Sequence, residues 1–378
     1  MADEAQRHGD GTGGGTGGGG AGGGGRGHRE GRGAGARAYV GSFTSAGGRG
    51  VLAATVNPRT GALTVTGASD AVPDPSFLVP APGGEVLYAV SETEEGAVAA
   101  FDVTGPAPRL LGDPAPVRGT HPTHLALAHG HALTANYGSG SVSALPLGPG
   151  GAPEPAGGVL HHHGTGPHPE RQTGPHAHQV VPAPGGRWVL SVDLGTDSVH
   201  VSALDPMTGE LTPHGRTALR PGSGPRHLAF HPSGSHAYVL AELAPTLTAC
   251  RWDPASGSLV PVGEPAVLPT RPGEEGESYP SGIVAAPDGR FLWAAVRGDD
   301  AIAVLALDGS RERPVPVATV PCGGHWPRDL TLDPRGRRLY VANERSGDVT
   351  WFDLDPETGL PSRAGSIEAP AASCVVFA

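Results

Sequence analysis

The 378-residue chain has few aromatic residues and few cysteines. Phe, Trp and Tyr make up 5% of it, so a core must consist mainly of Val, Leu and Ala packed between sheets. Cys250, Cys322 and Cys374 lie far apart and lack the spacing of a metal site. Because three cysteines cannot all pair, we expect reduced, buried thiols and a cytoplasmic location.

Signals for membranes, nucleic acids and several enzyme classes are also missing. The start, MADEAQRHGD, lacks the basic and then apolar layout of a signal peptide, and no apolar run reaches 18 residues. Lys and Arg number 26 against 37 Asp and Glu, a net charge of −11 without long blocks. That charge disfavours nucleic acid or an anionic membrane as a partner. No Gly-x-Ser-x-Gly elbow, phosphate loop or WD40 signal is present.

Glycine and proline, in contrast, are abundant. The 62 Gly and 40 Pro suit a fold with many turns, and a helical protein would hardly tolerate them. Residues 9–35 are mostly glycine without apolar periodicity, so ordering them would cost entropy that nothing offsets. We interpret residues 1–37 as a disordered tail and residues 38–378 as one folded domain.

A repeat runs through that domain. Six times, a proline-containing turn precedes an apolar stretch, a Pro-Gly type of turn and a second apolar stretch. The prolines that begin the copies are 47 to 55 residues apart: Pro75, Pro122, Pro175, Pro225, Pro280 and Pro327. A period of roughly 40 to 50 residues made of short strands is typical of propeller blades.

The two ends of the domain complement each other. Residues 38–67 form an incomplete copy, and residues 370–377 resemble only the first strand of one. Pairing the C-terminal strand with the N-terminal strands would complete a seventh, shared blade and protect sheet edges. The sequence therefore predicts an all-β, seven-bladed β-propeller.

Turn residues set the expected register. Pro232-Ser233-Gly234 and Pro287-Asp288-Gly289 supply glycines for hairpin turns with positive φ. Asp205, Asp355 and Asn57 precede Pro and a downstream Gly, which marks turns between outer strands.

Aligned copies differ at two places that face the channel in a propeller. The positions after the proline and at the end of the next strand carry different polar side chains, although the residues around them are similar in every copy. This suggests a site shared by several blades. These candidates are His124, His176, His178, Arg226, Arg328, Asp193, Glu242, Arg297 and Asn343.

Structural roles are the alternative for these residues. Asn136, Asp193 and Asn343 are of types that often satisfy turn backbone groups. The charges of Arg226 and Glu242 need a partner beside apolar strands, and a structural Arg–Glu pair would provide one.

A histidine-rich segment spans residues 161–178. His176-Ala177-His178 on a strand would point both rings to one side, as a metal pair requires. A metal site would need further ligands at defined spacing, and three adjacent histidines in a Gly-rich turn also fit a solvated loop. We favour a histidine general base or hydrogen-bond donor, with no metal and no cofactor.

Several motifs together resemble the seven-bladed lactonase family, which includes propeller-type 6-phosphogluconolactonases and fungal carboxy-muconate lactonizing enzymes. The resemblance covers about residues 38–378. Its motifs are Tyr39-Val40-Gly41-Ser42-Phe43-Thr44, Arg171-Gln172 with Gly174-Pro175-His176-Ala177-His178, Asp193-Leu194-Gly195-Thr196-Asp197, Gly224-Pro225-Arg226-His227 and Trp326-Pro327-Arg328-Asp329.

That resemblance implies a site of one His, two Arg and one Glu at the channel mouth. His178 matches the histidine, with His176 as the alternative, and the remaining matches are Arg226, Glu242 and Arg297. Val296 precedes Arg297 where the family commonly has Asn. The further substrate-binding candidates are Arg171, Arg328, His124, Asp193 and Asn343.

The implied activity is metal-independent hydrolysis of a sugar-derived, anionic lactone in the pentose phosphate pathway. His178 would take a proton from water with help from Glu242, while Arg226 or Arg297 stabilises the oxyanion or holds a phosphate or carboxylate. Two alternatives remain, a muconate-type lactonizing cycloisomerase on the same site and a non-enzymatic propeller that binds a protein or sugar.

Overall fold

A computed structural model describes residues 36–269 and 278–378. The tail predicted for residues 1–37 lies outside these residues, except that Arg37 already belongs to the first strand. The described residues form strands and two short 3-10 helices, η1 (Thr44–Ala46) and η2 (Pro149–Gly151). Neither helix has the length or the apolar character that crossing a membrane requires.

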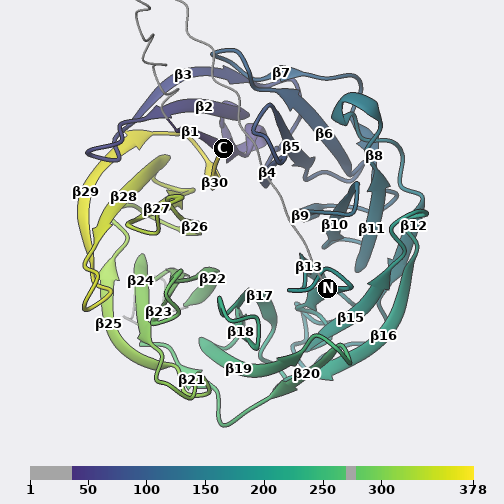
Figure 1. Ribbon diagram of the computed structural model, residues 1–378, viewed down its shortest axis with the longest axis vertical. Helices are drawn as coiled ribbons and strands as arrows, with labels where there is room; N and C mark the ends of the chain where they lie inside the picture. Colours follow the sequence, from purple (N-terminus) through teal and green to yellow (C-terminus); the bar gives the residue numbers. More distant parts are fainter. Residues whose placement is uncertain (1–35, 270–277) are drawn as a thin grey trace, which may run out of the picture. The chain divides into compact units, whose positions relative to one another are not determined.

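Seven antiparallel sheets surround a common centre (Figure 1). We number these blades 1 to 7 by their innermost strands, which are β4 (Leu78–Pro80), β9 (Pro122–Ala128), β13 (Ala177–Pro182), β17 (Pro225–Phe230), β22 (Tyr279–Ala285), β26 (Pro327–Leu332) and β30 (Ala372–Phe377). The second strands are, in the same order, β5 (Val86–Ser91), β10 (His131–Asn136), β14 (Trp188–Asp193), β18 (His236–Ala241), β23 (Phe291–Arg297), β27 (Arg338–Asn343) and β1 (Arg37–Ser42).

The remaining strands lie toward the outside of the ring. The third strands are β6 (Ala97–Asp102), β11 (Ser141–Pro146), β15 (Ser198–Leu204), β19 (Thr246–Asp253), β24 (Ala301–Ala306), β28 (Asp348–Leu354) and β2 (Val51–Val56). The outer strands are β7 (Arg109–Leu110) with β8 (Ala115–Pro116), β12 (Gly158–His161), β16 (Leu211–Ala218), β20 (Ser258–Pro261) with β21 (Ala266–Val267), β25 (Val315–Pro321), β29 (Pro361–Glu368) and β3 (Leu63–Ser69).

Blade 7 joins the two ends of the domain. Its strand order is β3-β2-β1-β30, and Val40 of β1 lies opposite Val375 of the C-terminal strand. The C-terminus therefore lies beside β1 in Figure 1. This arrangement confirms the predicted all-β, seven-bladed propeller and the predicted closure of its ring.

The predicted turns form as the residue types dictate. Gly234 and Gly289 adopt φ of 71° and 74°, a region open to glycine because it has no Cβ. The Asp205 carboxylate accepts hydrogen bonds from the N–H groups of Met207 and Thr208 at 2.8 and 2.9 Å. Such Asx turns close the outer strands at fixed length and set the register of each blade.

The core lies between neighbouring blades. Trp293 and Ile302 of blade 5 pack against Leu339, Val341 and Phe352 of blade 6, each less than 3% exposed. Fully burying one such side chain stabilises the fold by about 1.5–3 kcal/mol. Most other buried residues are Ala, Val and Leu, as the scarcity of aromatics predicts.

The three cysteines are also part of these interfaces. Cys250, Cys322 and Cys374 are buried and unpaired, and burial raises the pKa of each thiol to about 12. Free, buried thiols agree with the expectation from their spacing.

Candidate functional site

The innermost strands carry β-bulges at their channel-facing start. A bulge inserts an extra residue into a strand and re-aims its side chain. The bulged residues are all polar where the register shifts occur, apart from the glycine that accompanies Ser281: Thr123, His178, Arg226, Ser281 with Gly282, Arg328 and Ser373. Six of the seven blades thus carry a polar side chain at the bulge of the innermost strand.

Five of these bulged residues line one small recess. Its lining residues come from blades 1 to 4, 6 and 7: Ser76, Phe77, Glu92, Thr123, His178, Arg226, His227, Arg328, Asp329 and Ser373. The free volume inside is about 10 Å³, roughly the space that one water molecule needs. A sugar-sized molecule would therefore lie over the recess, with only a small group reaching into it.

Glu242 lies beside this recess and joins three arginines. Its Oε2 is 2.9 Å from Arg226 Nε and 2.8 Å from Arg297 Nη2, and its Oε1 accepts a hydrogen bond from Arg171 Nη2 at 2.7 Å. The Glu242, Arg226 and Arg297 side chains are less than 10% exposed, whereas that of Arg171 is 35% exposed. Arg297 also donates to the Tyr279 carbonyl at 3.1 Å. The structure therefore brings together three of the four predicted catalytic residues by direct contact.

The arginine cluster controls the charge of Glu242. Burial alone would raise the pKa of its carboxyl group, but Arg297, Arg226 and Arg171 outweigh burial and hold the pKa at about 2. Burial and the Arg297 charge lower the pKa of Arg226 to about 9. Glu242 is therefore an ionised counter-charge at neutral pH and a poor proton acceptor, so its role is to position the guanidinium groups.

His178, the fourth predicted catalytic residue, lines the recess with Arg226. Burial, followed by the charges of Arg226 and Arg328, lowers its pKa well below the ordinary histidine value. The ring meets Tyr137 edge-on at 5.6 Å between centroids. His178 is thus a neutral imidazole at physiological pH.

Two further neutral histidines adjoin it. His227 lies 5.2 Å from His178 and 5.5 Å from His124 between ring centroids. Burial lowers the pKa of His124 to about 3 and that of His227 well below its ordinary value, with Arg226 adding to both shifts. No described protein group hydrogen-bonds to His178 Nδ1, His227 Nε2 or His124 Nδ1.

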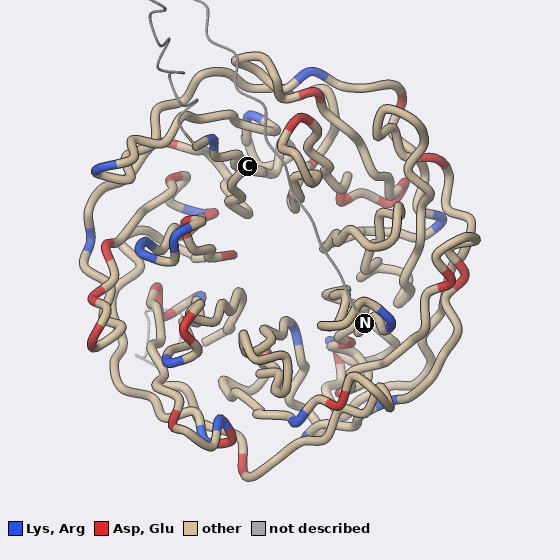
Figure 2. Tube along the Cα trace, viewed as in Figure 1, with Lys and Arg blue, Asp and Glu red and all other residues tan. Residues whose placement is uncertain are grey.

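Arg328 forms a second charged cluster on the other side of the recess. Its guanidinium is 3.1 Å from Glu344 and 3.6 Å from Glu92, and it lies over the Phe43 ring at 4.6 Å. Ser76 donates a hydrogen bond to Glu92. In Figure 2 charged residues line the outer strands and turns, and both signs also reach the inner side of the ring at the blade of β26–β28.

Asp329 follows Arg328 and is a partly exposed acid that lines the recess and forms no ion pair within the described residues. Burial raises the pKa of its carboxyl group to about 7, although Arg226 and Arg328 oppose this shift. Its Oδ1 is 2.7 Å from the point that a Cβ on Gly282 would occupy. In the aligned copies of the repeat, Asp329 and His227 directly follow the candidates Arg328 and Arg226, but neither was predicted as a site residue.

The second strand of each blade ends in two consecutive positions with different surroundings. We call the first the interblade position, which holds Ser42, Ser91, Asn136, Asp193, Ala241, Val296 and Asn343. We call the next the channel position, which holds Phe43, Glu92, Tyr137, Leu194, Glu242, Arg297 and Glu344. Side chains alternate along a strand, so neighbouring residues face opposite sides.

All interblade residues are buried, and the asparagines among them take part in hydrogen-bond networks. Asn136 Nδ2 donates to Ser141 and Ser143 at 3.0 and 2.8 Å, and Thr134 donates to its Oδ1 at 2.9 Å. Asn343 Nδ2 similarly donates to Thr350 at 3.2 Å, but no described group hydrogen-bonds to its Oδ1. Asp193 and Asn343, predicted as substrate-binding residues, therefore lie outside the recess.

The other predicted residues have mixed placements. His176 stacks on Tyr137 at 4.4 Å between centroids and contacts the Tyr137 carbonyl through Nδ1 at 2.9 Å. His124 contacts Phe77 and His227 behind the recess. Arg171 and Arg328 are partly exposed and reach the two charged clusters.

The histidine-rich segment contributes to an interblade network. His162, Asp193 and His200 hold potential metal-ligand atoms within 4.8 Å of one another. His162 Nδ1 is 2.6 Å from Asp193, His162 Nε2 is 3.0 Å from Ser191, and the His162 and His200 rings stack with centroids 3.8 Å apart. The interblade position of blade 2 holds Asn136 with hydroxyl partners, so we interpret this histidine cluster as the same network built from other residues.

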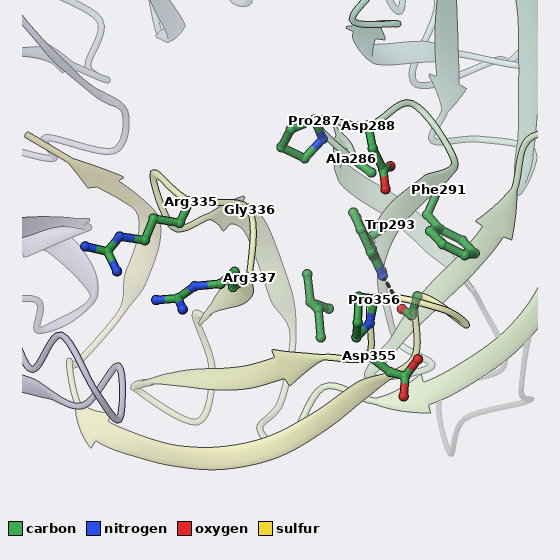
Figure 3. A pocket seen from close by; sticks show the side chains of 12 residues that line it. Ala286, Pro287, Asp288, Phe291, Trp293, Arg335, Gly336, Arg337, Asp355 and Pro356 are labelled. Carbon is green, nitrogen blue, oxygen red and sulfur yellow. Dashed lines mark hydrogen bonds between the residues drawn. The ribbon is translucent and has the colours of Figure 1, made fainter.

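A second pocket lies at the opposite end of the strands from the bulges (Figure 3). Its volume is about 320 Å³, and turns of blades 5 and 6 surround Phe291 and Trp293. The Trp293 indole donates to the Gly359 carbonyl at 2.8 Å, while Arg335 and Arg337 extend away from the two aromatic rings. A similar recess between blades 2 and 3 is lined by His129, Gly186 and Asp205. None of the predicted site residues lines either pocket.

Comparison with known proteins gives a consistent result over the whole domain. The family described as lactonase, 7-bladed beta-propeller, matches residues 37–377. A 6-phosphogluconolactonase of Bacillus subtilis is 31% identical over 347 residues, which cover 90% of this chain and 97% of that protein. A 6-phosphogluconolactonase of Formosa agariphila is 28% identical and covers 85% of this chain and 93% of its own length.

Solved structures extend the similarity to three dimensions. The periplasmic gluconolactonase of Pseudomonas aeruginosa is 27% identical, with a TM-score of 0.84 over 90% of this chain and 98% of that chain. A protein from Lactobacillus plantarum has a TM-score of 0.83 at 27% identity over 91% and 99% of the two chains. With the fold, the family match and these relatives in agreement, the chain belongs to the seven-bladed β-propeller lactonase family.

Proposed function

We propose that this protein hydrolyses a sugar-derived, anionic lactone, with 6-phosphogluconolactone as the first candidate substrate. The observation that carries the proposal is the contact of Glu242 with Arg226 and Arg297 beside a recess that also holds His178. The relatives described as 6-phosphogluconolactonases and as a gluconolactonase support this class of substrate.

The arginines suit the charge that develops during lactone opening. Attack of water on the ring carbonyl places negative charge on the carbonyl oxygen, and donors held in place before the reaction stabilise it most. Arg226 Nη1 has no hydrogen-bond partner among the described protein groups, and Arg226 Nε forms an ion pair with Glu242 Oε2 at 2.9 Å. Arg226 is therefore our candidate oxyanion donor, with Arg297 as its buried neighbour.

The partly exposed arginines suit the anionic group of the substrate. Arg171 and Arg328 have side chains 35% and 21% exposed; Arg171 pairs with Glu242, and Arg328 pairs with Glu344 and Glu92. Arginine binds phosphate and carboxylate through paired hydrogen bonds. The sequence predicts that His178 takes the proton from water; here it is assigned as a neutral hydrogen-bonding partner of the attacking water, because its pKa is far below the ordinary value.

A pH-stat assay of the purified full chain tests the proposal. The substrates are 6-phosphogluconolactone, gluconolactone and a carboxy-muconolactone, each corrected for spontaneous opening. We expect the phosphorylated lactone to give the highest kcat/KM, and Arg226→Ala and His178→Ala to lower it by about 100-fold or more.

Arg290→Ala, which removes an exposed arginine paired with Asp288 on an outer turn, is the control and should leave turnover unchanged. A parent protein that opens none of the sugar lactones above background would overturn the proposal. Turnover of the muconolactone alone would move the function to lactonizing chemistry.

A further inference from the structure

Asp329 occupies a place that the neighbouring blade keeps open. It follows the bulged Arg328 on β26, and its Oδ1 lies over Gly282 of β22. A Cβ at Gly282 would be 2.7 Å from this oxygen, so any other residue there would displace the carboxyl group. The residues equivalent to Gly282 in blades 1, 2 and 4 have larger side chains. They are Phe77, His124 and His227. Blade 5 thus has a glycine where the carboxyl group of blade 6 needs room.

Residues that line the recess with Asp329 carry buried polar atoms that need partners. Among the described residues, no protein group hydrogen-bonds to His178 Nδ1, His227 Nε2 or Arg226 Nη1, and each of these residues is more than 90% buried. Buried polar groups are nearly always hydrogen-bonded, commonly to an ordered water. The recess has the volume for about one water molecule. It also combines a cationic donor with neutral imidazoles and a carboxyl group, so both hydrogens and lone pairs of a water find partners.

We propose that this recess holds the water that attacks the lactone and that Asp329 is the general base that activates it. The inference rests on the proposed lactone hydrolysis and assigns a role to a residue outside the His, Arg, Glu and Arg set. Hydrolysis requires a water in the site, so a dedicated water position favours a hydrolase.

Asp329 lines the recess and is suited to accept a proton near neutral pH. Arg226 and Arg328 face it and favour its ionised form, but burial outweighs them and sets its pKa at about 7. The pKa of His178 is far lower, because burial and the same arginines disfavour its charged form. A base is most effective when its pKa lies near the working pH. His178 and His227 then orient the water, and Asp329 takes its proton.

The other groups near Asp329 do not replace it. The Cys374 thiol on β30 has a pKa raised to about 12 by burial and stays neutral. Burial also raises the pKa of Glu92, but both oxygens of this carboxylate already have partners, because Oε2 accepts a hydrogen bond from Ser76 and Oε1 is 3.6 Å from Arg328. Glu242 is ionised but is a weak base with a pKa of about 2.

The proposed step balances in protons and bonds. Asp329 removes one proton from the water as the water oxygen bonds to the lactone carbonyl carbon, and Arg226 stabilises the resulting oxyanion. The oxyanion re-forms the carbonyl, the ring C–O bond breaks, and protonated Asp329 gives its proton to the departing ring oxygen. The products are a hydroxyl group and a carboxylic acid, which releases its proton to solvent.

The test compares Asp329→Asn with the parent in the pH-stat assay on 6-phosphogluconolactone. We expect Asp329→Asn to lower kcat/KM by about 100-fold or more, the usual contribution of a general base. In the parent, kcat/KM should rise with pH through about 7, and in the variant this rise should be lost. Asp113→Asn changes an exposed aspartate of the same charge and should keep the parent's rate and pH profile.

Two further measurements separate a base from a structural or donor role. Binding of 6-phosphogluconate, the ring-opened product, should stay within about 3-fold of the parent in Asp329→Asn if the charged clusters remain intact. Gly282→Ala, which crowds the carboxyl group without removing it, should lower kcat more than it raises KM.

Three results would overturn the base assignment. One is a parent-like rate or pH profile in Asp329→Asn. Another is a kcat/KM that Asp329→Asn keeps and Asp329→Ala loses, because this would show that Asp329 acts through hydrogen bonds and not as a base. The third is a parent without any lactone turnover, which defeats the proposed function as well, whereas the first two leave that function standing.

Discussion

The interblade and channel positions are adjacent in sequence and differ in what satisfies their polar groups. At the interblade position, Asn136 and Asp193 have hydroxyl, imidazole or backbone partners supplied by the fold. At the channel position, Glu242 pairs with arginines that themselves reach the recess. Strand alternation sends neighbouring side chains to opposite faces, so a shift of one residue separates structure from candidate chemistry.

The same contrast holds for two aspartates on different blades, the fully buried Asp193 of blade 3 and the partly exposed Asp329 of blade 6. Asp193 accepts hydrogen bonds from the N–H groups of His176 and Thr196, both at 3.0 Å, and contacts His162. These partners outweigh burial and lower its pKa. Asp329 lacks such a set of partners, and burial raises its pKa. A carboxyl group that the fold stabilises as an anion has a structural role, and one that the fold leaves protonatable is available for chemistry.

Glu242→Gln should give the largest effect. It leaves Arg226 and Arg297 buried without their counter-charge, which we expect to cost about 3–5 kcal/mol in the free energy of unfolding. The pKa of Glu242 is about 2, below the ordinary 4.5, so its contribution is present above pH 4.5 and is lost as the pH falls toward 2. Denaturant unfolding of parent and variant from pH 7 to pH 3 measures both effects.

Glu210→Gln, an exposed change on an outer turn, is the matched control and should stay within about 0.5 kcal/mol of the parent. Equal stability of Glu242→Gln and the parent at pH 7 would show that the arginine cluster does not depend on this carboxylate.

Asp329→Asn and Asp193→Asn should change stability in opposite directions. The pKa of Asp329 is raised from the ordinary 3.8 to about 7, so its favourable contribution is present below pH 3.8 and is lost as the pH rises through 7. The Asn variant avoids this loss. It should become more stable than the parent between pH 4 and 7, by on the order of 2 kcal/mol after allowance for the partial exposure of Asp329.

Asp193→Asn should instead destabilise the protein at neutral pH, because it removes an anion that the fold binds. Thermal or denaturant unfolding of both variants at pH 4.5 and pH 8 provides the comparison. If both variants were more stable than the parent at pH 8, or both less stable, the distinction between the two aspartates would be wrong.

Asn136→Ala and Tyr137→Phe should give the smallest and most selective effects. Asn136→Ala leaves three buried hydroxyl groups short of a partner and should cost about 1–3 kcal/mol in unfolding free energy, while kcat/KM stays within about 2-fold. Tyr137→Phe keeps the aromatic ring but removes the hydroxyl group that accepts a hydrogen bond from Arg171. It should raise KM several-fold and leave unfolding within about 0.5 kcal/mol. A loss of turnover in Asn136→Ala together with a loss of stability in Tyr137→Phe would show that the interblade position serves catalysis and the channel position serves the fold.

The blades were predictable because their signals are local. The anchoring prolines, the turn glycines and the apolar strands recur in every copy, and each acts within a few residues of its own position. The shared blade followed from the incomplete copies at the two ends. The candidate site was predictable in part, because Glu242, Arg226 and Arg297 are charges beside apolar strands that required partners.

The parts that escaped prediction depend on contacts between blades. Aligning the copies placed Asp193 with Leu194 and Asn343 with Glu344, but only the contacts in the folded structure show that Asp193 and Asn343 lie in hydrogen-bond networks and that Glu344 pairs with Arg328. Asp329 did not stand out, because its importance depends on the glycine of the neighbouring blade. Glu92 and Tyr137 likewise meet their partners from other blades.

The sequence by itself determined the number of blades, the closure of the ring and the residue types that each blade directs toward the centre, because these follow from periodicity and turn chemistry within each copy. The tertiary structure alone decided which charges pair, which histidines stay neutral and which carboxyl group remains protonatable. Those properties depend on burial and on distances between side chains from different blades, and no spacing along one chain encodes them.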